Sequence, residues 1–219
     1  MYVETFVRAD PGELWRLTQD PALHSRWDLR FSEIRPVDAR NFRYRWTVIT
    51  GDGWTTADRS RGISTLRFAS ADRRSPIVSG SGYWRYVPAG DGVRFLTWYD
   101  YTPRHRLLDP VFRPLMWWAT AWSFDRLRLW LERGRPPELP LLQAVAEAAV
   151  RIAAVAWTGS PWVALAAITL PHLPGTPSAR RCAYEKRSDD DIDLPAGHGA
   201  RVRAAASRIT AALRRGDRR

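Results

Sequence analysis

A short strand followed at once by two short helices is the feature of this sequence that most constrains its fold. Residues 3–8 read VETFVR, a strand pattern, and Asp10-Pro11 follows directly. Asp10 is a good N-cap, Pro11 suits the first helical position, and Glu13 completes a capping box. The sequence therefore predicts a strand up to about residue 8 and a helix from about residue 11.

This helix should end at Asp20-Pro21, because the residue before a proline is pushed out of the helical region. Asp20 can cap a second short helix that runs from Pro21 to Trp27, and a strand pattern resumes near Phe31. A helix–turn–helix on the protein surface would have the same local pattern. Both interpretations stay open at the level of these residues.

The next seventy residues or so are strand-like. In residues 42–49 the apolar side chains of Phe42, Tyr44, Trp46 and Val48 alternate with polar ones, which is the period of a half-buried strand. Residues 51–53 (GDG) are predicted as the turn that follows. Further strand patterns lie at residues 55–62 and 65–70.

Residues 80–88 (GSGYWRYVP) and 93–101 (VRFLTWYDY) flank a turn at residues 89–92, which predicts a hairpin. If Arg85 and Arg94 point outward, the inward-facing side chains are Trp84, Tyr86, Phe95, Thr97, Tyr99 and Tyr101. This phase turns the apolar Leu96 and Trp98 outward, so the opposite phase of the 93–101 strand stays open.

A long helix is predicted from Pro114 to Arg133. Trp117, Phe124 and Leu127 belong to one helical stripe, and Gly134 suits a C-terminal cap. A helix of about 20 residues is about 30 Å long, which is enough to cross a curved antiparallel sheet.

Three parts are expected: a folded domain at 1–136, an Ala-rich apolar helical segment at 137–173, and a polar, partly disordered basic tail at 174–219. Residues 152–170 carry no charge, which meets the length criterion for a membrane span. However, Gly159-Ser160-Pro161 interrupts the segment. A broken helical pair, packed on the domain or lying at a membrane surface, is the alternative. In the tail, residues 201–215 form either a short basic helix or a frayed end.

The net charge is +11, but basic and acidic residues interleave in the first 138 residues, so we do not expect nucleic-acid binding. Cys182 is the single cysteine, which excludes an intrachain disulfide and fits a reducing compartment. No signal peptide is visible at the N-terminus. We therefore expect a cytoplasmic domain, either free or at the inner face of the cell membrane.

Several kinds of chemistry are unsupported by the sequence. Before residue 139 there is no lysine and no cysteine, which excludes a Schiff-base lysine or a thiolate nucleophile there. No phosphate-binding glycine loop is present. His24, His105, His172 and His198 lack metal-ligand spacing, and we interpret each as a surface histidine. We expect no metal and no cofactor.

The remaining candidate is an aromatic interior with a few polar groups. Large rings on a curved sheet beneath one helix pack poorly without leaving space, and inward tyrosines and a threonine are typical of ligand pockets. A well-packed core is the alternative. The predicted cavity residues are Tyr44, Trp46, Phe68, Trp84, Tyr86, Phe95, Thr97 and Tyr99 from the sheet, and Trp118 and Trp122 from the long helix.

The segments VETFVRADPGELWRLTQDPALHSRWD, GSGYWRYVP, VRFLTWYDY and WSFDRLRLWLE, in this order within residues 1–135, resemble the START-like superfamily, also labelled SRPBCC. It includes polyketide cyclases and dehydrases, lipid-transfer domains and plant allergen-type proteins. The resemblance implies an α+β helix-grip fold, in which a seven-stranded incurved antiparallel sheet is followed by a long helix over its concave face. It also implies a cavity whose mouth lies near Trp27 and Asp28, and it carries over no catalytic motif.

Together these features favour binding or transfer of a lipophilic small molecule, lipid-like or polyketide-like. A membrane tether formed by residues 139–170 is a further expectation. A first alternative is a cyclase or dehydrase in which a pocket tyrosine, a pocket arginine or Asp100 carries out acid–base chemistry. A second alternative is a structural or regulatory partner domain with a vestigial cavity. The sequence does not identify the ligand or the oligomeric state.

Overall fold

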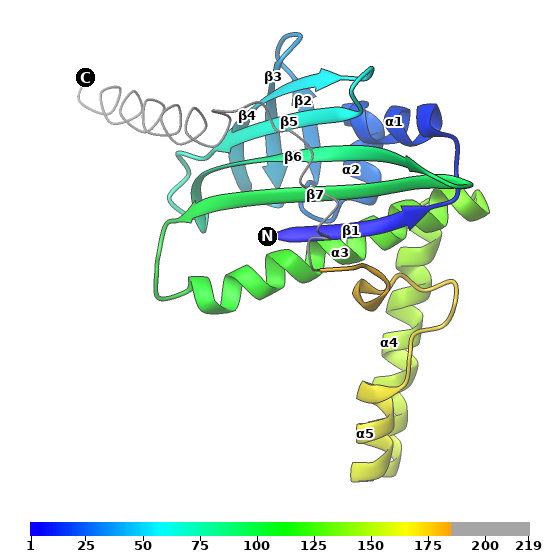
Figure 1. Ribbon diagram of the computed structural model, residues 1–219. Coiled ribbons are helices and arrows are strands. Elements are labelled where there is room, and N and C mark those ends of the chain that lie inside the picture. Colours follow the sequence, from blue (N-terminus) through cyan, green and yellow to red (C-terminus); the bar gives the residue numbers. More distant parts are fainter. Residues whose placement is uncertain (185–219) are drawn as a thin grey trace.

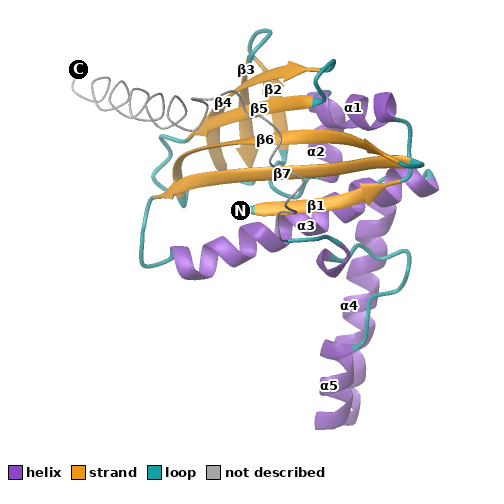
Figure 2. Ribbon diagram, in the orientation of Figure 1, coloured by secondary structure: helices purple, strands orange, loops and turns teal. Residues whose placement is uncertain are grey.

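The computed structural model describes residues 1–184, so the expectations for residues 185–219 lie outside the described part. Figure 1 labels the elements and Figure 2 separates helices from strands. In chain order they are β1 (Tyr2–Val7), α1 (Pro11–Gln19), α2 (Pro21–Trp27), β2 (Glu33–Pro36), β3 (Asn41–Trp46), β4 (Ile49–Asp58), β5 (Ile63–Ala69), β6 (Ile77–Ala89), β7 (Gly92–Pro103), α3 (Asp109–Arg133), α4 (Glu138–Thr158), α5 (Pro161–Thr169) and the 3-10 turn η1 (Ala179–Arg181).

The seven strands form one sheet in the order β1-β7-β6-β5-β4-β3-β2, and every neighbouring pair is antiparallel. Strands β2 to β7 follow one another as a meander, whereas β1 lies at the opposite edge from β2. The helices α1 and α2 connect these two edges, and α3 runs across one face of the sheet (Figure 1). This arrangement is the helix-grip architecture, so the predicted α+β fold is confirmed.

The N-terminal helices form where their caps predict. The side chain of Asp10 accepts a hydrogen bond from the Glu13 amide at 3.0 Å, and that of Asp20 accepts one from the Ala22 amide at 2.9 Å. Leu14 and Trp27 are fully buried against the rest of the domain. The two helices are therefore part of the core, and the interpretation as a surface helix–turn–helix is wrong.

The predicted strand at residues 42–49 is too long. The strand β3 ends at Trp46, and the chain turns at residues 47–48 instead of at 51–53. Gly51 and Gly53 belong to β4, where a side chain at either position would collide with the ring of Tyr44 or Phe42. These glycines therefore make room for aromatic rings of the neighbouring strand rather than forming a turn.

The hairpin of β6 and β7 has the predicted turn and the predicted phase. Trp84 pairs with Thr97, and Gly82 pairs with Tyr99, all on the face toward α3. The Trp98 side chain is exposed on the outer face. A side chain at Gly82 would collide with the Tyr99 backbone and Cβ, so this glycine allows the strands to lie close together.

The helix α3 begins at Asp109, five residues before the predicted start at Pro114. Pro110 occupies its first turn, where a missing N–H costs little, and Asp109 supplies negative charge near the N-terminus. Gly134 ends the helix in the left-handed conformation, with φ of 62°. The sequence therefore locates the end of this helix better than its beginning, because Pro114 lies inside it.

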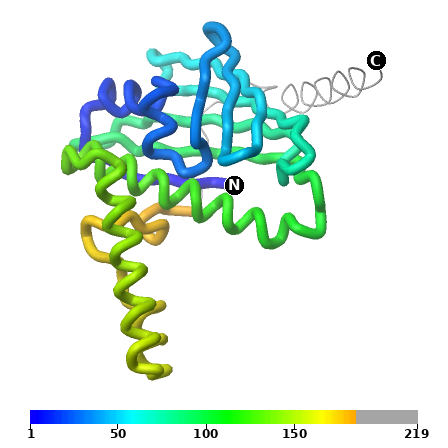
Figure 3. The backbone as a smooth tube through the Cα atoms, turned by 180° about the vertical axis from the view of Figure 1, so that it is seen from behind, coloured from blue at the N-terminus to red at the C-terminus, as the bar shows by residue number. Residues whose placement is uncertain are grey.

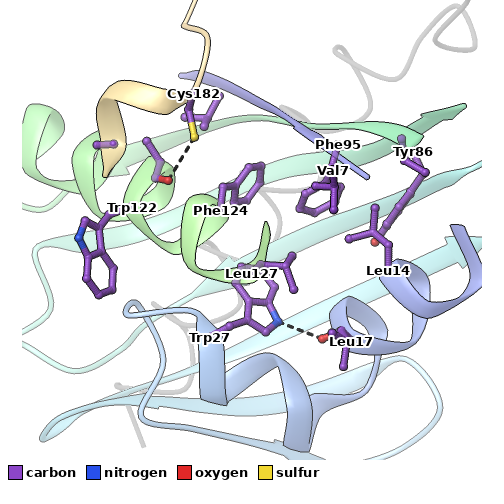
Figure 4. Packing of buried hydrophobic residues seen from close by; sticks show 14 residues of the cluster. Val7, Leu14, Leu17, Trp27, Tyr86, Phe95, Trp122, Phe124, Leu127 and Cys182 are labelled. Atoms are coloured by element: carbon purple, nitrogen blue, oxygen red, sulfur yellow. Dashed lines mark hydrogen bonds between the residues drawn. The ribbon is translucent and has the colours of Figure 1, made fainter. Parts of the chain in front are cut away.

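The core lies between α3, the inner face of the sheet and the two short helices (Figure 4). Phe95 stacks on Phe124 with ring centroids 4.6 Å apart, and both are fully buried. The Trp27 indole donates a hydrogen bond to the Leu17 carbonyl at 2.9 Å, which satisfies its one polar atom. These contacts join α2, α3 and β7 into one cluster.

The helices α4 and α5 form a hairpin that projects away from the sheet and α3 (Figures 1 and 3). Gly159, in the left-handed conformation with φ of 57°, ends α4, and Pro161 begins α5. The uncharged segment at residues 152–170 is therefore not one continuous helix but a broken helical pair. Among the described helices, α4 is long and apolar enough to cross a membrane by length and composition.

The segment after the hairpin returns to the domain, so a tail beginning at residue 174 is wrong for its first residues. The Ser178 amide donates a hydrogen bond to Asp125 at 2.8 Å, and the Cys182 thiol donates one to the Ala121 carbonyl at 3.2 Å. Glu4 and Ala183 exchange two backbone hydrogen bonds at the free edge of β1. Both ends of the hairpin are therefore fixed to the same folded domain.

Candidate functional site

A cavity of about 380 Å³ lies between the inner face of the sheet and the N-terminal half of α3. Its walls come from β3 to β7, from α2 and the loop after it, and from residues 112–119 of α3. Leu115 and Trp118 are the most exposed of the lining side chains, at 52% and 45%. The cavity therefore opens beside the N-terminal half of α3, and its volume lies within the range of small-molecule sites.

Most of the predicted cavity residues do line this space. Phe42 and Tyr44 of β3 pack over the glycines of β4, and Gly80 makes the same room for Phe68. Burial raises the pKa of the Tyr44 phenol to about 12, so it stays a neutral hydrogen-bonding group at the wall. The predicted residues that line the cavity are Tyr44, Trp46, Phe68, Trp84, Thr97, Tyr99 and Trp118.

Three predicted cavity residues belong to the packed core instead. Phe95 is enclosed by Phe124 and Tyr86, with ring centroids 4.6 Å and 5.1 Å away. The Tyr86 hydroxyl is paired with Thr18 at 2.6 Å and with Gln19 at 2.9 Å. Trp122 is buried in the same cluster. The helix α1 packs against Tyr86 through Trp15 and Thr18, so Tyr86 and the neighbouring Phe95 belong to the core at this end of the sheet.

The prediction that Trp27 and Asp28 lie at the mouth is wrong. Both side chains are buried, at 0% and 1% exposure, and neither lines the cavity. Trp27 lies in the core and stacks on the ring of His24, with centroids 4.9 Å apart. Asp28 lies behind the cavity wall, where it holds two polar side chains that face the cavity.

These two side chains are His24 and Arg30, which with Asp28 form a buried polar cluster. The Arg30 guanidinium donates to both carboxylate oxygens of Asp28, Nε to Oδ1 at 2.9 Å and Nη2 to Oδ2 at 2.6 Å. The His24 Nε2 lies 3.1 Å from Oδ2. Burial alone would raise the pKa of Asp28, but Arg30 and His24 together hold it well below its usual range.

An ionised Asp28 fixes the tautomer of His24, because a carboxylate only accepts hydrogen bonds and Nε2 must carry the proton. In the neutral imidazole, the other ring nitrogen, Nδ1, then carries a lone pair. No described residue makes a hydrogen bond to Nδ1, and no polar side-chain atom in residues 1–184 is both buried and unpaired. Since His24 lines the cavity, its Nδ1 is accessible there.

Tyr99 is a third polar group at this end of the cavity. The Arg30 guanidinium lies 5.5 Å from the centre of the Tyr99 ring, and the Tyr99 hydroxyl is 2.8 Å from the Thr120 hydroxyl. Burial raises the pKa of Tyr99. Asp100, the carboxylate proposed from the sequence for acid–base chemistry, is instead on the outer face and pairs with Arg113 at 3.2 Å.

His24 and Arg30 were missed by the sequence analysis, where His24 was interpreted as a surface residue. A signal was present, because His24 and Asp28 are four residues apart and so lie on one side of a short helix. Arg30, however, lies beyond the end of α2, and a local turn, in which the Arg30 amide donates to Asp28 at 3.0 Å, brings its guanidinium back onto Asp28. Within residues 1–184, no group of three or more His, Cys, Asp or Glu side chains is placed to hold a metal ion.

No family model matches the sequence. The chain is 39% identical over 168 residues to the uncharacterized membrane protein YndG of Bacillus subtilis (strain 168), a match that covers 66% of this chain. The chain spans 62% of the length of that relative.

Similar solved structures include Ara h 8.0201, at 10% identity and a TM-score of 0.48 over 60% of this chain and 95% of that one. CV1439 from Chromobacterium violaceum has 14% identity and a TM-score of 0.47, over 60% and 96%. The di-domain ARO/CYC BexL has 15% identity and a TM-score of 0.42, over 53% and 43%. The fold itself follows from the strand order and from the position of α3. The chain has the helix-grip fold.

Proposed function

We propose that this protein binds or transfers a lipophilic small molecule, lipid-like or polyketide-like, in the cavity beneath α3. The observation that supports this most is the cavity itself, a space of about 380 Å³ with mainly apolar and aromatic walls. Burial of a ligand's apolar surface against such walls is favourable by about 25 cal/mol per Å². This space also counts against the alternative of a structural partner domain with a vestigial cavity.

The polar groups of the cavity restrict the ligand further. Asp28 neutralises Arg30, and the His24 Nδ1 offers a hydrogen-bond acceptor beside them. The ligand we propose therefore has an apolar body and one hydroxyl, phenol or acid group that meets His24. The apolar end would lie toward Leu115 and Trp118, where the cavity opens.

Two matched substitutions on β7 test this proposal. Thr97 lines the cavity, whereas Thr102 is exposed on the same strand. Thr97→Phe fills part of the cavity and should weaken binding of the neutral fluorescent probe N-phenyl-1-naphthylamine by about tenfold or more, which corresponds to about 1.4 kcal/mol. Thr102→Phe should leave it unchanged. Equal binding by both variants, or no probe binding and no copurifying apolar molecule in native mass spectrometry, would refute the proposal.

A second candidate function is proton transfer in a cyclase or dehydrase type of reaction. The observation that favours it is the pair of His24 and Asp28, because a carboxylate that fixes Nε2–H leaves Nδ1 as an oriented base. Arg30 lies beside it and could stabilise negative charge that develops on a carbonyl oxygen. Such a site would remove a proton from a carbon next to a carbonyl group.

A model reaction tests whether His24 acts as a base. With 5-nitrobenzisoxazole, a base removes the C–H proton while the N–O bond breaks, and the product is a coloured cyanophenolate. His24→Ala should lower this rate about a hundredfold, the lower range for a positioned base. The control His105→Ala changes an exposed histidine outside the cavity and should have no effect. If His24→Ala keeps the full rate, the protein is a binding module without this chemistry.

We also propose that the hairpin of α4 and α5 associates the protein with a membrane, at its cytoplasmic face. Supporting this, α4 is an apolar helix of 21 residues with little burial, and the relative YndG is named a membrane protein. Fractionation of cells tests the association. Full-length protein that stays in the soluble fraction without detergent would contradict it.

A further inference from the structure

The hairpin of α4 and α5 has an exposed apolar end, residues 152–170 around its turn, and a polar end next to the domain. From residue 152 to residue 170 there is no charged side chain. Trp157 and Trp162 flank the turn at Gly159 and are 92% and 77% exposed. Further apolar residues of the same segment are also exposed, namely Ile152, Leu165, Ile168 and Leu170. Exposed apolar surface of this extent marks an interaction site.

Arg151 marks the border between the two ends. Its guanidinium donates hydrogen bonds to the carbonyls of Ala167 at 2.6 Å, Leu170 at 3.1 Å and Pro171 at 3.0 Å, and to Glu147 at 2.7 Å. It therefore satisfies the carbonyl groups at the C-terminal end of α5. Glu147 in turn accepts a hydrogen bond from the Thr176 hydroxyl at 2.7 Å.

Two more arginines lie at the same level of the hairpin. Arg180 is exposed, lies 3.5 Å from the Thr169 carbonyl through Nη1, and forms no ion pair with any residue of 1–184. Arg181 donates to the Leu173 carbonyl at 3.1 Å and pairs with Asp125 at 2.8 Å. Arg151 and Arg181 are thus held by carboxylates, and Arg180 adds an exposed positive charge at the border of the apolar end. That charge is complementary to the phosphate groups that lie above the hydrocarbon of an anionic membrane.

We propose that residues 152–170 insert into one leaflet of a lipid bilayer and do not cross it, with Arg151 and Arg180 at the level of the lipid phosphates. The seven helical residues after Arg151 extend about 10 Å, and the nine residues of α5 about 14 Å, at 1.5 Å per residue. Either length fits within one leaflet, since the hydrocarbon core of both leaflets together is about 30 Å thick. The inference specifies the membrane contact of the proposed function and is independent of what the cavity binds.

The fold excludes a simple crossing. Both ends of the hairpin are fixed to one domain, through Glu138 with Arg26 at 2.9 Å and through Ser178 with Asp125 at 2.8 Å. Two crossings would be needed, and the nine residues of α5 are too few for one, since a spanning helix needs about 20.

Insertion of the whole of α4 is also unfavourable. It would bring the non-helical backbone of residues 171–178, together with Glu147 and Arg151, into the hydrocarbon. Neither irregular backbone exposed to lipid nor charged side chains are tolerated at that depth without partners. Insertion up to Arg151 leaves all of these groups in the polar layer of the membrane.

Labelled cysteines in the full chain test the depth of insertion. Trp157→Cys and Trp162→Cys place a thiol at the tip, and Leu142→Cys places one on α4 on the domain side of Arg151. The native Cys182 is buried and its thiol has a pKa raised to about 12 by burial, so it should not react. Each variant carries an environment-sensitive nitrobenzoxadiazole label and is mixed with phosphatidylcholine–phosphatidylglycerol vesicles.

We expect lipid-borne spin labels to quench the fluorophore at positions 157 and 162 but not at position 142. Dithionite enclosed in the vesicles should not bleach any of the three labels. Bleaching at position 157 by enclosed dithionite would show that the tip reaches the far side, which would overturn the proposal in favour of a span. Equal and weak quenching at all three positions would overturn it as well.

A charge introduced at the tip gives a second test. The double variant W157E/W162E should bind the vesicles at least tenfold more weakly than the parent, whereas the control Leu142→Glu should bind within twofold of it. These exposed sites do not affect the cavity, so binding of N-phenyl-1-naphthylamine should be unchanged in all variants. A lipid-free dimer in sedimentation experiments that W157E/W162E dissociates, with vesicle binding unaffected, would show that a second copy covers the hairpin and would overturn the proposal.

Discussion

The two long helices α3 and α4 have opposite surroundings, and the more apolar of the two is the more exposed. Nine residues of α3 are buried, including the charged Asp125 and Arg126, whereas Pro140 is the sole buried residue of α4. The sheet covers α3 and the two short helices pack beside it, while no described element except α5 lies along most of α4 (Figures 1 and 3). The apolar residues of a helix therefore do not show what the helix packs against. The partner of α3 is the sheet, whereas by our proposal the partner of α4 is lipid.

The largest expected difference between the two regions is in core packing. Phe124→Ala removes a fully buried ring of α3 that stacks on Phe95, and it should lower the free energy of unfolding by about 4 kcal/mol. Trp157→Ala on the exposed tip of α4 should change it by less than about 0.5 kcal/mol without lipid. Urea unfolding of both variants measures this. Similar losses would mean that the hairpin packs on the domain.

A buried ion pair in each region gives the next comparison. Asp28→Asn leaves Arg30 without its carboxylate and should cost about 3 kcal/mol at neutral pH. The pKa of Asp28 is lower in the folded state, so its stabilisation is present above about pH 4 and is lost as the pH falls below that. The difference between parent and variant should therefore shrink in acid, as followed by urea unfolding at several pH values.

Glu147→Gln is the matched change in the hairpin. Glu147 holds Arg151 and Thr176, so its loss should loosen residues 172–176 and the end of α5 rather than unfold the domain. Hydrogen exchange should show faster exchange confined to these residues. A loss of global stability as large as that of Asp28→Asn would show that hairpin and domain unfold as one unit.

The smallest effects are expected at two helix-ending glycines. Gly134 after α3 and Gly159 after α4 both have positive φ and open space where a side chain would lie. Alanine at either position should cost about 1 kcal/mol of backbone strain. In Gly134→Ala this cost should appear in urea unfolding of the whole domain, whereas in Gly159→Ala it should appear only as faster hydrogen exchange at the tip.

The fold could be predicted from the sequence because its signals are local. Asp10-Pro11 and Asp20-Pro21 fix two helix starts, and the turn signal at residues 89–92 fixes a hairpin, while the phase of its second strand was settled only by the structure. Where a glycine serves a neighbouring strand, as Gly51 does for Tyr44, the local signal is misleading and the turn was misplaced.

The candidate site was predictable only in part, because its wall depends on contacts between distant elements. The alternation of β3 and β7 identifies Tyr44 and Tyr99 as inward residues. A ring on the inner face lines the cavity or belongs to the packed core, depending on how far α1 extends along the sheet. Because α1 contacts Tyr86, this residue belongs to the core. Arg30 reaches Asp28 through a turn that no periodic pattern indicates.

The most direct test of this division between a binding domain and a membrane hairpin is hydrogen exchange of the full chain, with N-phenyl-1-naphthylamine and anionic vesicles added separately. We expect the probe to slow exchange in the cavity segments around residues 24–31 and 82–99, and the vesicles to slow it at residues 152–170. Probe protection confined to the hairpin, or vesicle protection confined to the cavity segments, would contradict the account.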